Sequence, residues 1–222
     1  MISIIIPTLN EGDYILKSVK GLQNLRKEKV CEIIIIDGGS NDDTLDLVFT
    51  YVDKIFSISP SRSLQQNLGA SLANGNLLLF LHADTILNEK DLLKLREHIE
   101  EISWGYFLVS LGENMFKYKI LEKCINMRSK LFKYATGDQG IFIKKELFEM
   151  IGGFPNINLM EDIAICKLLK KNSPPHIFDS QIITSSRRWK ENGFLSTILQ
   201  MRLFRLLYAA GVSPNLLGRH YQ

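Results

Sequence analysis

The sequence predicts an α/β fold with an open, twisted, mostly parallel sheet flanked by helices. Three short apolar runs, at residues 2–6, 33–36 and 77–81, each end abruptly at a polar loop. Nearly continuous β-branched and aliphatic runs of this length are typical of strands covered on both faces. Segments with apolar residues at helical spacing separate the runs. Strand and helix therefore alternate in the first half of the chain, as in a parallel sheet.

The helices expected in the first half have apolar faces and recognisable start signals. Ser40 and Asp43 form a capping pair before the second helix, and Ser59 and Pro60 provide a cap and a first-turn proline for the third. These four helices cover residues 14–25, 45–48, 64–72 and 88–99. The second half is less regular. There we expect strands at 104–109, 141–143 and 181–185, and helices at 114–132, 161–171 and 191–210.

The composition is that of a folded domain of 222 residues, 45% hydrophobic and 23% charged. A net charge of +3 without a block of Lys or Arg argues against a nucleic-acid partner. The three cysteines form no CxxC pair, which indicates a reducing compartment and no zinc knuckle. The run at 2–6 lacks the basic region and cleavage site of a signal peptide, and no stretch of about 18 apolar residues occurs, so we expect neither a signal peptide nor a membrane span. We therefore expect a cytoplasmic protein, either free or at the inner membrane face.

Polar residues follow each of the three apolar runs, at the point where the predicted strand ends. They include Glu11 after the first run, Asp37 after the second and Asp84 after the third. Each segment taken alone is equally well explained by a tight turn or a helix cap. Because ligands of open α/β sheets bind outside the carboxyl ends of the strands, three polar ends in parallel order favour one shared site.

The ligand expected at this site is a nucleotide held without a glycine-rich cradle. The first strand is followed by neither GxGxxG nor a P-loop. A diphosphate then needs a metal ion or cationic side chains. Asp84 is suited to Mg²⁺ or Mn²⁺, which binds carboxylate and phosphate oxygens and neutralises a departing diphosphate. Arg62 adds a second positive group, unless it is an ordinary surface arginine.

Several segments resemble glycosyltransferase family 2, whose members are inverting enzymes of the GT-A fold. The openings IIIPTLNEG, EIIIIDGGSND and LLLFLHADT carry the resemblance. It continues through residues 61–63, 67–70, 136–140, 152–154, 159–162 and 187–189. It implies one GT-A domain over residues 1–222, with a Rossmann-like nucleotide-binding half at about 1–100 and an acceptor half at about 101–222. The implied activity is transfer of a sugar from a nucleotide-diphosphate donor, typically a UDP-sugar, to a hydroxyl acceptor.

The resemblance also assigns the donor side of the site. Asp84 corresponds to the last carboxylate of the family's DxD metal motif, and His82 stands where that motif has its first carboxylate. This implies Mn²⁺ or Mg²⁺ held by Asp84, with His82 as an imidazole partner and a less strict dependence on the metal. Asp37 would accept a hydrogen bond from the base. The implied nucleotide-binding residues are Pro7, Thr8, Glu11, Asp37, Arg62 and Asn67.

On the acceptor side, Glu161 and Asp162 match the family's Glu-Asp pair at a helix start, in which the Asp is the general base. An inverting transfer needs one carboxylate to take the proton of the attacking hydroxyl. Adjacent helical residues point about 100° apart, so we assign the base to Asp162 and an orienting role to Glu161. Acids in a first turn also complement the helix dipole, which is the competing interpretation. Asp138 and Gln139 either contact the acceptor or sugar or form a simple glycine turn.

Arg187, Arg188 and Trp189 resemble the RW end of the QxxRW motif of processive polysaccharide synthases. Ser185 occupies the glutamine position, and the membrane helices of those enzymes are missing. We therefore expect a single transfer, with Arg188 near the diphosphate and Trp189 as an apolar wall for a sugar. Surface cations beside a partly buried tryptophan are the alternative.

The segments LHADT, GDQG, LMED and RRW resemble most closely a compact subgroup of the family that lacks membrane anchors. This subgroup is associated with radical-SAM and selenodomain proteins and with arsenosugar biosynthesis.

Apolar residues at 194–210 form a broad stripe with three interpretations. The stripe packs onto the domain, docks on a membrane surface or contacts a second copy. Membrane docking would suit a polyprenyl-phosphate sugar transferase. A catalytically degenerate nucleotide-sugar-binding module is a further alternative for the whole chain, because only one of the two DxD carboxylates is present.

Overall fold

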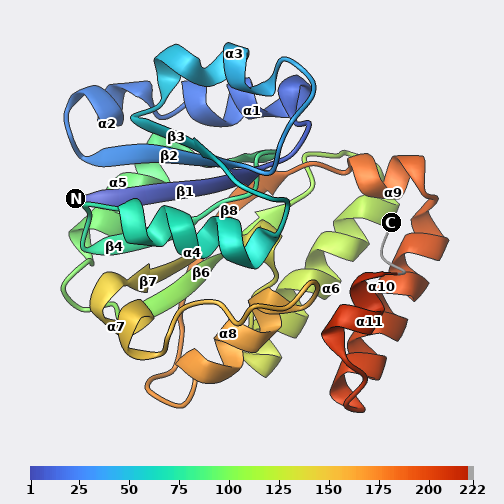
Figure 1. The fold of residues 1–222 in the computed structure, drawn as a ribbon. Helices are drawn as coiled ribbons and strands as arrows, with labels where there is room; N and C mark the ends of the chain where they lie inside the picture. The colour runs from blue at the N-terminus through green and yellow to red at the C-terminus, as the bar shows by residue number, and fades with distance from the viewer. Residues whose placement is uncertain (220–222) are drawn as a thin grey trace.

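An eight-stranded sheet runs through the computed structural model, which describes residues 1–219 (Figure 1). The strand order is β3-β2-β1-β4-β7-β6-β8-β5. Only β7 and β5 run antiparallel to their neighbours in the described sheet, which confirms the expected mostly parallel arrangement. The strands are β1 (Ile2–Thr8), β2 (Cys31–Asp37), β3 (Lys54–Ser57), β4 (Leu77–Phe80), β5 (Thr85–Ile86), β6 (Trp104–Ser110), β7 (Ile141–Lys144) and β8 (His176–Thr184).

Helices cover both faces of the sheet (Figure 1). The core on one face includes side chains of α1, α3, α5 and α6, and the core on the other includes side chains of α4, α7 and α8. The α-helices are α1 (Gly12–Lys20), α2 (Gln23–Lys27), α3 (Thr44–Val48), α4 (Arg62–Leu72), α5 (Glu89–Glu97), α6 (Phe116–Phe132), α7 (Lys145–Met150), α8 (Glu161–Leu169), α9 (Arg187–Glu191), α10 (Phe194–Ala209) and α11 (Pro214–Gly218). Two 3₁₀ turns are η1 (Phe49–Tyr51) and η2 (Gly137–Gln139).

The isoleucine runs of β1 and β2 bury side chains on both faces, because successive strand residues alternate in direction. Ile4 and Ile33 join one core, whereas Ile5 and Ile34 join the other. Helix α4 approaches β1 closely at Gly69, where a Cβ atom would lie 2.3 Å from the Ile5 side chain. The central strands are therefore held from both sides, and their carboxyl ends are fixed in position.

Two predicted helix starts are wrong. The backbone of Ser61 is extended, so α4 begins at Arg62 and Pro60 lies before the helix, not in its first turn. The Ser40 hydroxyl donates to Asp37 and accepts the N–H of Asn10, and α3 has no side-chain cap among the described residues. In the second case the polar residue serves the loop after β2, which outweighed the local capping pattern.

Other elements differ in their bounds. The helix expected at 191–210 begins later, as α10 at Phe194, because Gly193 has a φ of 82° that interrupts helical geometry; the separate helix α9 lies before it. The helix expected at 14–25 is divided into α1 and α2. β8 begins at residue 176, before the predicted 181. The short elements β3, β5 and α11 were not predicted, because their apolar patterns are too brief to stand out.

Helix α10 packs one side onto the protein and exposes the other. Thr197 and Phe204 are buried, while Leu195, Leu199 and Leu203 are exposed. Packing onto the domain therefore accounts for only one side of this segment. Within residues 1–219, no helix combines the length and the hydropathy that crossing a bilayer requires.

Candidate active site

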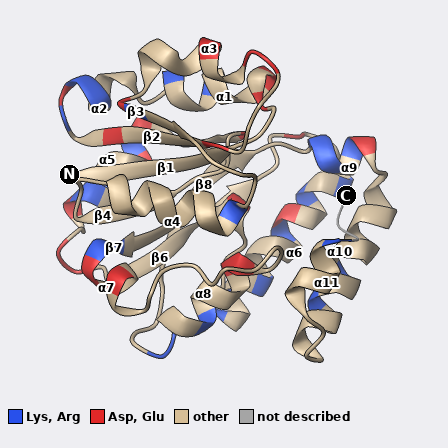
Figure 2. Ribbon diagram, in the orientation of Figure 1, with Lys and Arg blue, Asp and Glu red and all other residues tan. Residues whose placement is uncertain are grey.

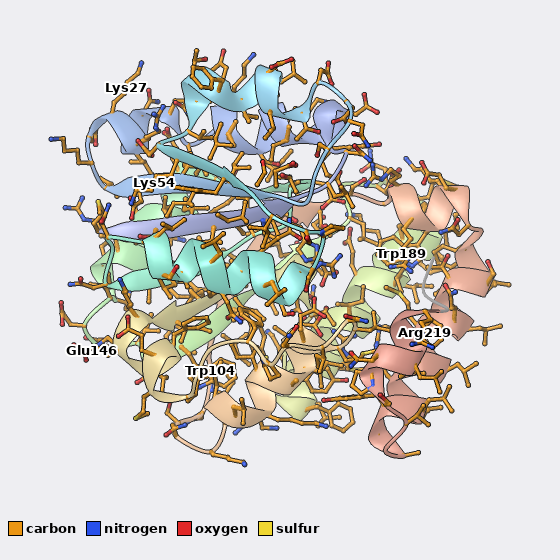
Figure 3. All side chains as sticks on the ribbon, in the orientation of Figure 1. Lys27, Lys54, Trp104, Glu146, Trp189 and Arg219 are labelled. Carbon is orange, nitrogen blue, oxygen red and sulfur yellow. The ribbon has the colours of Figure 1, made fainter. Side chains whose placement is uncertain are left out.

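A cavity of about 830 Å³ opens at the edge of the sheet where β1 and β4 end. Because β7 runs antiparallel to β4, the turn η2 that precedes it lies at the same edge. The cavity walls come from the loops after β1 and β4, from η2, from the starts of α4 and α8, and from α6, α9 and α10. Figure 3 shows Trp189, one of the wall residues, beside α9 and α10 on the opposite side of the view from Lys27.

Most of the predicted site residues share this cavity. Asp84 and Asp162, the predicted metal ligand and the predicted base, both line it. The predicted residues in its walls are Pro7, Glu11, Arg62, His82, Asp84, Asp138, Glu161, Asp162, Arg187, Arg188 and Trp189. The predicted residues that are not among the wall residues are Thr8, Asp37, Asn67 and Gln139, of which all but Asn67 are buried.

Asp37 shapes the turn that follows β2. Its carboxylate accepts the N–H groups of Gly39 and Ser40, both at 2.8 Å, and the hydroxyls of Ser40 and Thr8. Gly39 has a φ of 92°, which glycine adopts without strain. Asp37 is 1% exposed, with its lone pairs turned to these donors. The tight turn considered as an alternative for this segment is thus present, and the implied contact between Asp37 and a base stays a prediction.

Asn67 and Gln139 support the walls of the cavity. The Asn67 amide bonds both the N–H and the carbonyl of Phe154 at 2.9 Å, which ties α4 to the segment before α8. Gln139 is fully buried, accepts the Ser129 hydroxyl at 2.8 Å and donates to the carbonyl of Phe107. Both amides thus hydrogen-bond to neighbouring segments of the protein, and their implied contacts with a ligand stay predictions.

Carboxylates gather around one arginine at the donor side of the cavity. Arg187 lies 3.1 Å from Glu11 and stacks on the ring of Tyr14. Burial raises the pKa of Glu11, against the opposing effect of Arg187. Burial also raises the pKa of Asp84; Arg187 lowers it, and the charge of Asp138 raises it further. Arg62 lowers both pKa values as well, so three acids lie near two arginines, and this side of the cavity remains favourable for an additional positive charge.

Two backbone amides orient the Asp162 carboxylate at the start of α8. The N–H of Gly137 donates to Oδ2 at 2.9 Å, and the N–H of Ile163 donates to Oδ1 at 2.7 Å. Burial, and after it the charge of Glu161, raises the pKa of Asp162 to about 6, although these two hydrogen bonds act in the opposite direction. A carboxyl group that titrates near neutral pH can accept and release a proton, as a general base must.

Glu161 anchors a cation at the cavity wall. It is almost fully buried and lies 3.3 Å from the Arg62 guanidinium. Met160, the residue before it, has a φ of 67° in the left-handed region, which residues other than glycine seldom adopt. Such strain persists where surrounding contacts impose it, and here it sets the direction in which α8 begins.

His82 lies against the backbone of Gly137. A Cβ atom on Gly137 would lie 2.3 Å from His82 Nε2, so only glycine fits at this position. Burial lowers the pKa of His82 to about 3, which keeps the imidazole neutral. Among the described residues, its Nε2 is buried without a hydrogen-bond partner.

The side chains fit a divalent cation held mainly by substrate oxygens. Within residues 1–219, no three His, Cys, Asp or Glu side chains are grouped closely enough to enclose a metal ion. Asp138 Oδ1 is buried without a partner in the same part of the chain, and its charge acts on Asp84. One or two carboxylates plus phosphate oxygens is the usual way in which proteins hold Mg²⁺ at a nucleotide.

The other end of the cavity is apolar and lies between α6 and α10, where sequence analysis did not predict it. Arg205 also lines this end; burial lowers its pKa, and so does the neighbouring charge of Arg128. These contacts join helices that are far apart in the sequence, so no local spacing marks them. The apolar wall residues from the two helices are Leu121, Ile125, Phe132, Ile198, Met201, Phe204 and Leu206.

A second hollow, of about 710 Å³, lies beside α1 and α5. Lys20, Asn88 and Lys94 are among its wall residues, and none of the predicted site residues lines it. It lacks the convergence of strand ends that brings Asp84 and Asp162 together. We therefore place the candidate active site in the larger cavity.

Comparison with known proteins agrees with the motifs in this cavity. The family model described as Glycosyl transferase family 2 matches residues 3–143. PGL/p-HBAD biosynthesis glycosyltransferases of Mycobacterium bovis and Mycobacterium tuberculosis are 31% identical over 169 residues, which cover 69% of this chain. Poly(ribitol-phosphate) beta-N-acetylglucosaminyltransferase TarP of Staphylococcus aureus is 23% identical and covers 85% of this chain and 59% of its own length. This chain spans 63% of the length of the mycobacterial relatives.

Solved structures confirm the GT-A type of α/β fold. Staphylococcus aureus TarS in complex with UDP-GlcNAc has a TM-score of 0.65 and 16% identity, and the match covers 83% of this chain and 58% of TarS. Glucosyl-3-phosphoglycerate synthase from Mycobacterium tuberculosis, in complex with Mn²⁺, UDP and phosphoglyceric acid, has a TM-score of 0.65 and 18% identity, with 96% and 79% coverage. The association with the radical-SAM subgroup stays a prediction. On the family model and the mycobacterial relatives together, this chain belongs to glycosyl transferase family 2.

Proposed function

We propose that this chain is an inverting glycosyltransferase that moves a sugar from a nucleotide-diphosphate donor, in particular a UDP-sugar, to a hydroxyl acceptor. The observation that carries the proposal is that Asp84 and Asp162 line one cavity, at the edge where parallel strands end. Membership of the family and the UDP and UDP-GlcNAc bound to proteins of the same fold support this choice of donor.

Asp162 performs the proton transfer in this proposal. Its carboxylate takes the proton of the acceptor hydroxyl while the hydroxyl oxygen attacks the anomeric carbon. The bond between that carbon and the diphosphate oxygen breaks on the opposite side, so the configuration inverts and the nucleoside diphosphate leaves. The amides of Gly137 and Ile163 hold the carboxylate in one orientation during this step.

Cationic groups in the cavity walls stabilise the charge that develops on the departing diphosphate. Arg62 and Arg187 are both wall residues, fixed by Glu161 and Glu11 respectively. Positioned charges of this kind stabilise a transition state without reorganising during the reaction. A divalent cation, Mn²⁺ or Mg²⁺, would be held by Asp84 with Asp138 nearby, and when bound it would neutralise diphosphate charge as a Lewis acid.

A degenerate binding module is the rival function. Such a module would need the nucleotide site but no working base. The burial of Asp162, its orientation by two amides and its pKa of about 6 favour the enzyme.

A screen of nucleotide sugars for slow hydrolysis tests the proposal without knowledge of the acceptor. With Mn²⁺ present, we expect one nucleotide sugar to release its nucleoside diphosphate. The Asp162→Asn variant is expected to bind UDP with unchanged affinity and to lose hydrolysis by about 10²-fold or more. Absence of hydrolysis and of binding for every nucleotide sugar would overturn the proposal, and equal turnover by the variant would remove Asp162 from the role of base.

A further inference from the structure

Two helices on one side of the molecule expose rows of apolar side chains to solvent. Figure 1 shows α6 and α10 side by side, and both contribute walls to the cavity. Their exposed large apolar residues, here called the α6–α10 face, are Phe116, Ile120, Met127, Leu131, Leu195, Leu199, Leu203 and Leu206. The four leucines of α10 are each more than half exposed. Within each helix these residues recur at spacings of three, four or seven, so each helix exposes one apolar row. Grouped apolar surface marks an interaction site, whereas single exposed residues do not.

The two helices that carry the α6–α10 face are rich in Lys and Arg. Of these residues, Arg128, Arg202 and Arg205 line the cavity, Lys119 pairs with Glu122, and Lys130 pairs with Asp179. Residues 116–133 and 194–219 contain nine Lys or Arg residues and one carboxylate, Glu122, whereas the whole chain has a net charge of only +3. Figure 2 shows these basic residues as blue bands on α6 and α10. Glu122 is buried and pairs with Lys119 at 3.3 Å, so it offsets the charge of that one lysine. The part of the chain outside these helices is therefore net negative.

This charge distribution selects between the possible occupants. A second copy of the chain would bring two cationic faces together, which is unfavourable. An anionic lipid surface attracts the Lys and Arg side chains and accepts the apolar rows between them. We propose that the α6–α10 face docks on an anionic lipid bilayer. The apolar end of the cavity lies between the same two helices, so docking turns that end toward the lipid.

Flotation of the full chain with lipid vesicles, in the absence of donor and acceptor, tests this proposal. Vesicles that contain phosphatidylglycerol are expected to carry the protein, and vesicles of phosphatidylcholine alone to carry much less. Binding should weaken as salt is added, because exposed charges are screened. Failure of the wild type to float with either kind of vesicle would overturn the proposal.

A pair of variants separates docking from a general effect on the surface. Leu199→Gln with Leu203→Gln changes two exposed residues outside the cavity walls and is expected to lower the vesicle partition coefficient by roughly tenfold or more. Phe49→Gln with Met150→Gln changes two equally exposed residues on other elements and should leave partitioning unchanged. Equal flotation of the leucine variant and the wild type would contradict docking by this face.

Two further measurements keep the outcomes distinct. Lys123→Glu with Lys130→Glu leaves the apolar rows intact and should remove the preference for anionic lipid; a retained preference would contradict the charge argument.

Light scattering establishes the oligomeric state: a dimer that the leucine variant dissociates would show that the occupant is a second copy. UDP binding to the leucine variant should match the wild type, so that failure of docking and failure of the proposed function are read separately.

Discussion

Replacing Asp162 with asparagine removes a buried titratable group while keeping its size. Burial raises the pKa of Asp162 from 3.8 to about 6. Between these values the unfolded chain loses this proton while the folded protein keeps it, so folding becomes less favourable as the pH rises. The wild type therefore has its full stability at this group below about pH 4 and has lost it above about pH 6. At about 1.4 kcal/mol for each pKa unit, the loss is about 3 kcal/mol.

The Asp162→Asn variant does not titrate at this position. Its free energy of unfolding, relative to the wild type, is therefore expected to rise by about 2.5 kcal/mol between pH 4 and pH 8, because the unfolded wild-type chain is already partly ionised at pH 4. The asparagine also has one acceptor oxygen in place of two for the amides of Gly137 and Ile163. The lost acceptor destabilises the variant by about 1–3 kcal/mol at every pH. It therefore shifts the stability difference between variant and wild type by a constant amount and does not change how that difference varies with pH.

Urea denaturation of both proteins at intervals from pH 4 to pH 8 measures this difference. Asp179→Asn is the control, because the Asp179 side chain is 88% exposed and pairs only with the surface residue Lys130. Its difference from the wild type should stay within about 0.5 kcal/mol across the range. If the stability difference for Asp162→Asn is the same at all pH values, the carboxyl group is not desolvated and the reasoning is refuted.

Three further predictions concern the neighbours of Asp162. Gly137→Ala places a Cβ atom 2.3 Å from His82 Nε2 and should destabilise the protein by about 1–3 kcal/mol; thermal unfolding with an unchanged midpoint would contradict this. Arg62→Met removes a cation that lowers the pKa of Asp162, so the pH at which transfer or hydrolysis is half-maximal should move upward, and an unmoved pH–rate profile would argue against the contact. Asp84→Asn should abolish any increase in UDP affinity caused by Mn²⁺, measured by calorimetry; a retained increase would place the metal elsewhere.

The sheet and the edge that holds the site were predictable from the sequence. The runs at 2–6, 33–36 and 77–81 are buried on both faces, and that burial is what makes such runs nearly continuous. Once the strands are parallel, their carboxyl ends must meet at one edge, so Glu11 and Asp84 share a cavity. Topology, more than any single motif, brought these residues together.

The roles of the polar residues at this edge were harder to predict. Asp37, Asn67 and Gln139 have the chemistry of ligand-binding residues, but their hydrogen bonds are made inside the protein. Residue type alone does not reveal whether a side chain is already satisfied. The peptide N–H of Gly137 carries no sequence signal, although it orients Asp162.

The apolar end of the cavity was beyond sequence reasoning for a different reason. It depends on how α10 packs against α6, and the break at Gly193 sets where α10 begins. The stripe at 194–210 contains residues of both kinds: Phe204 faces the cavity, and Leu199 faces solvent. Helical periodicity predicts that this helix has a buried face and an exposed face, but it does not give the width of the buried face.

A crystal structure of the chain with UDP and Mn²⁺ tests the central claim most directly. The account predicts the diphosphate and the metal in the larger cavity, beside Asp84 and Arg187, with the Asp162 carboxylate facing the same space. Nucleotide bound in the hollow lined by Lys20, Asn88 and Lys94, or at any surface remote from Asp84 and Asp162, would contradict it.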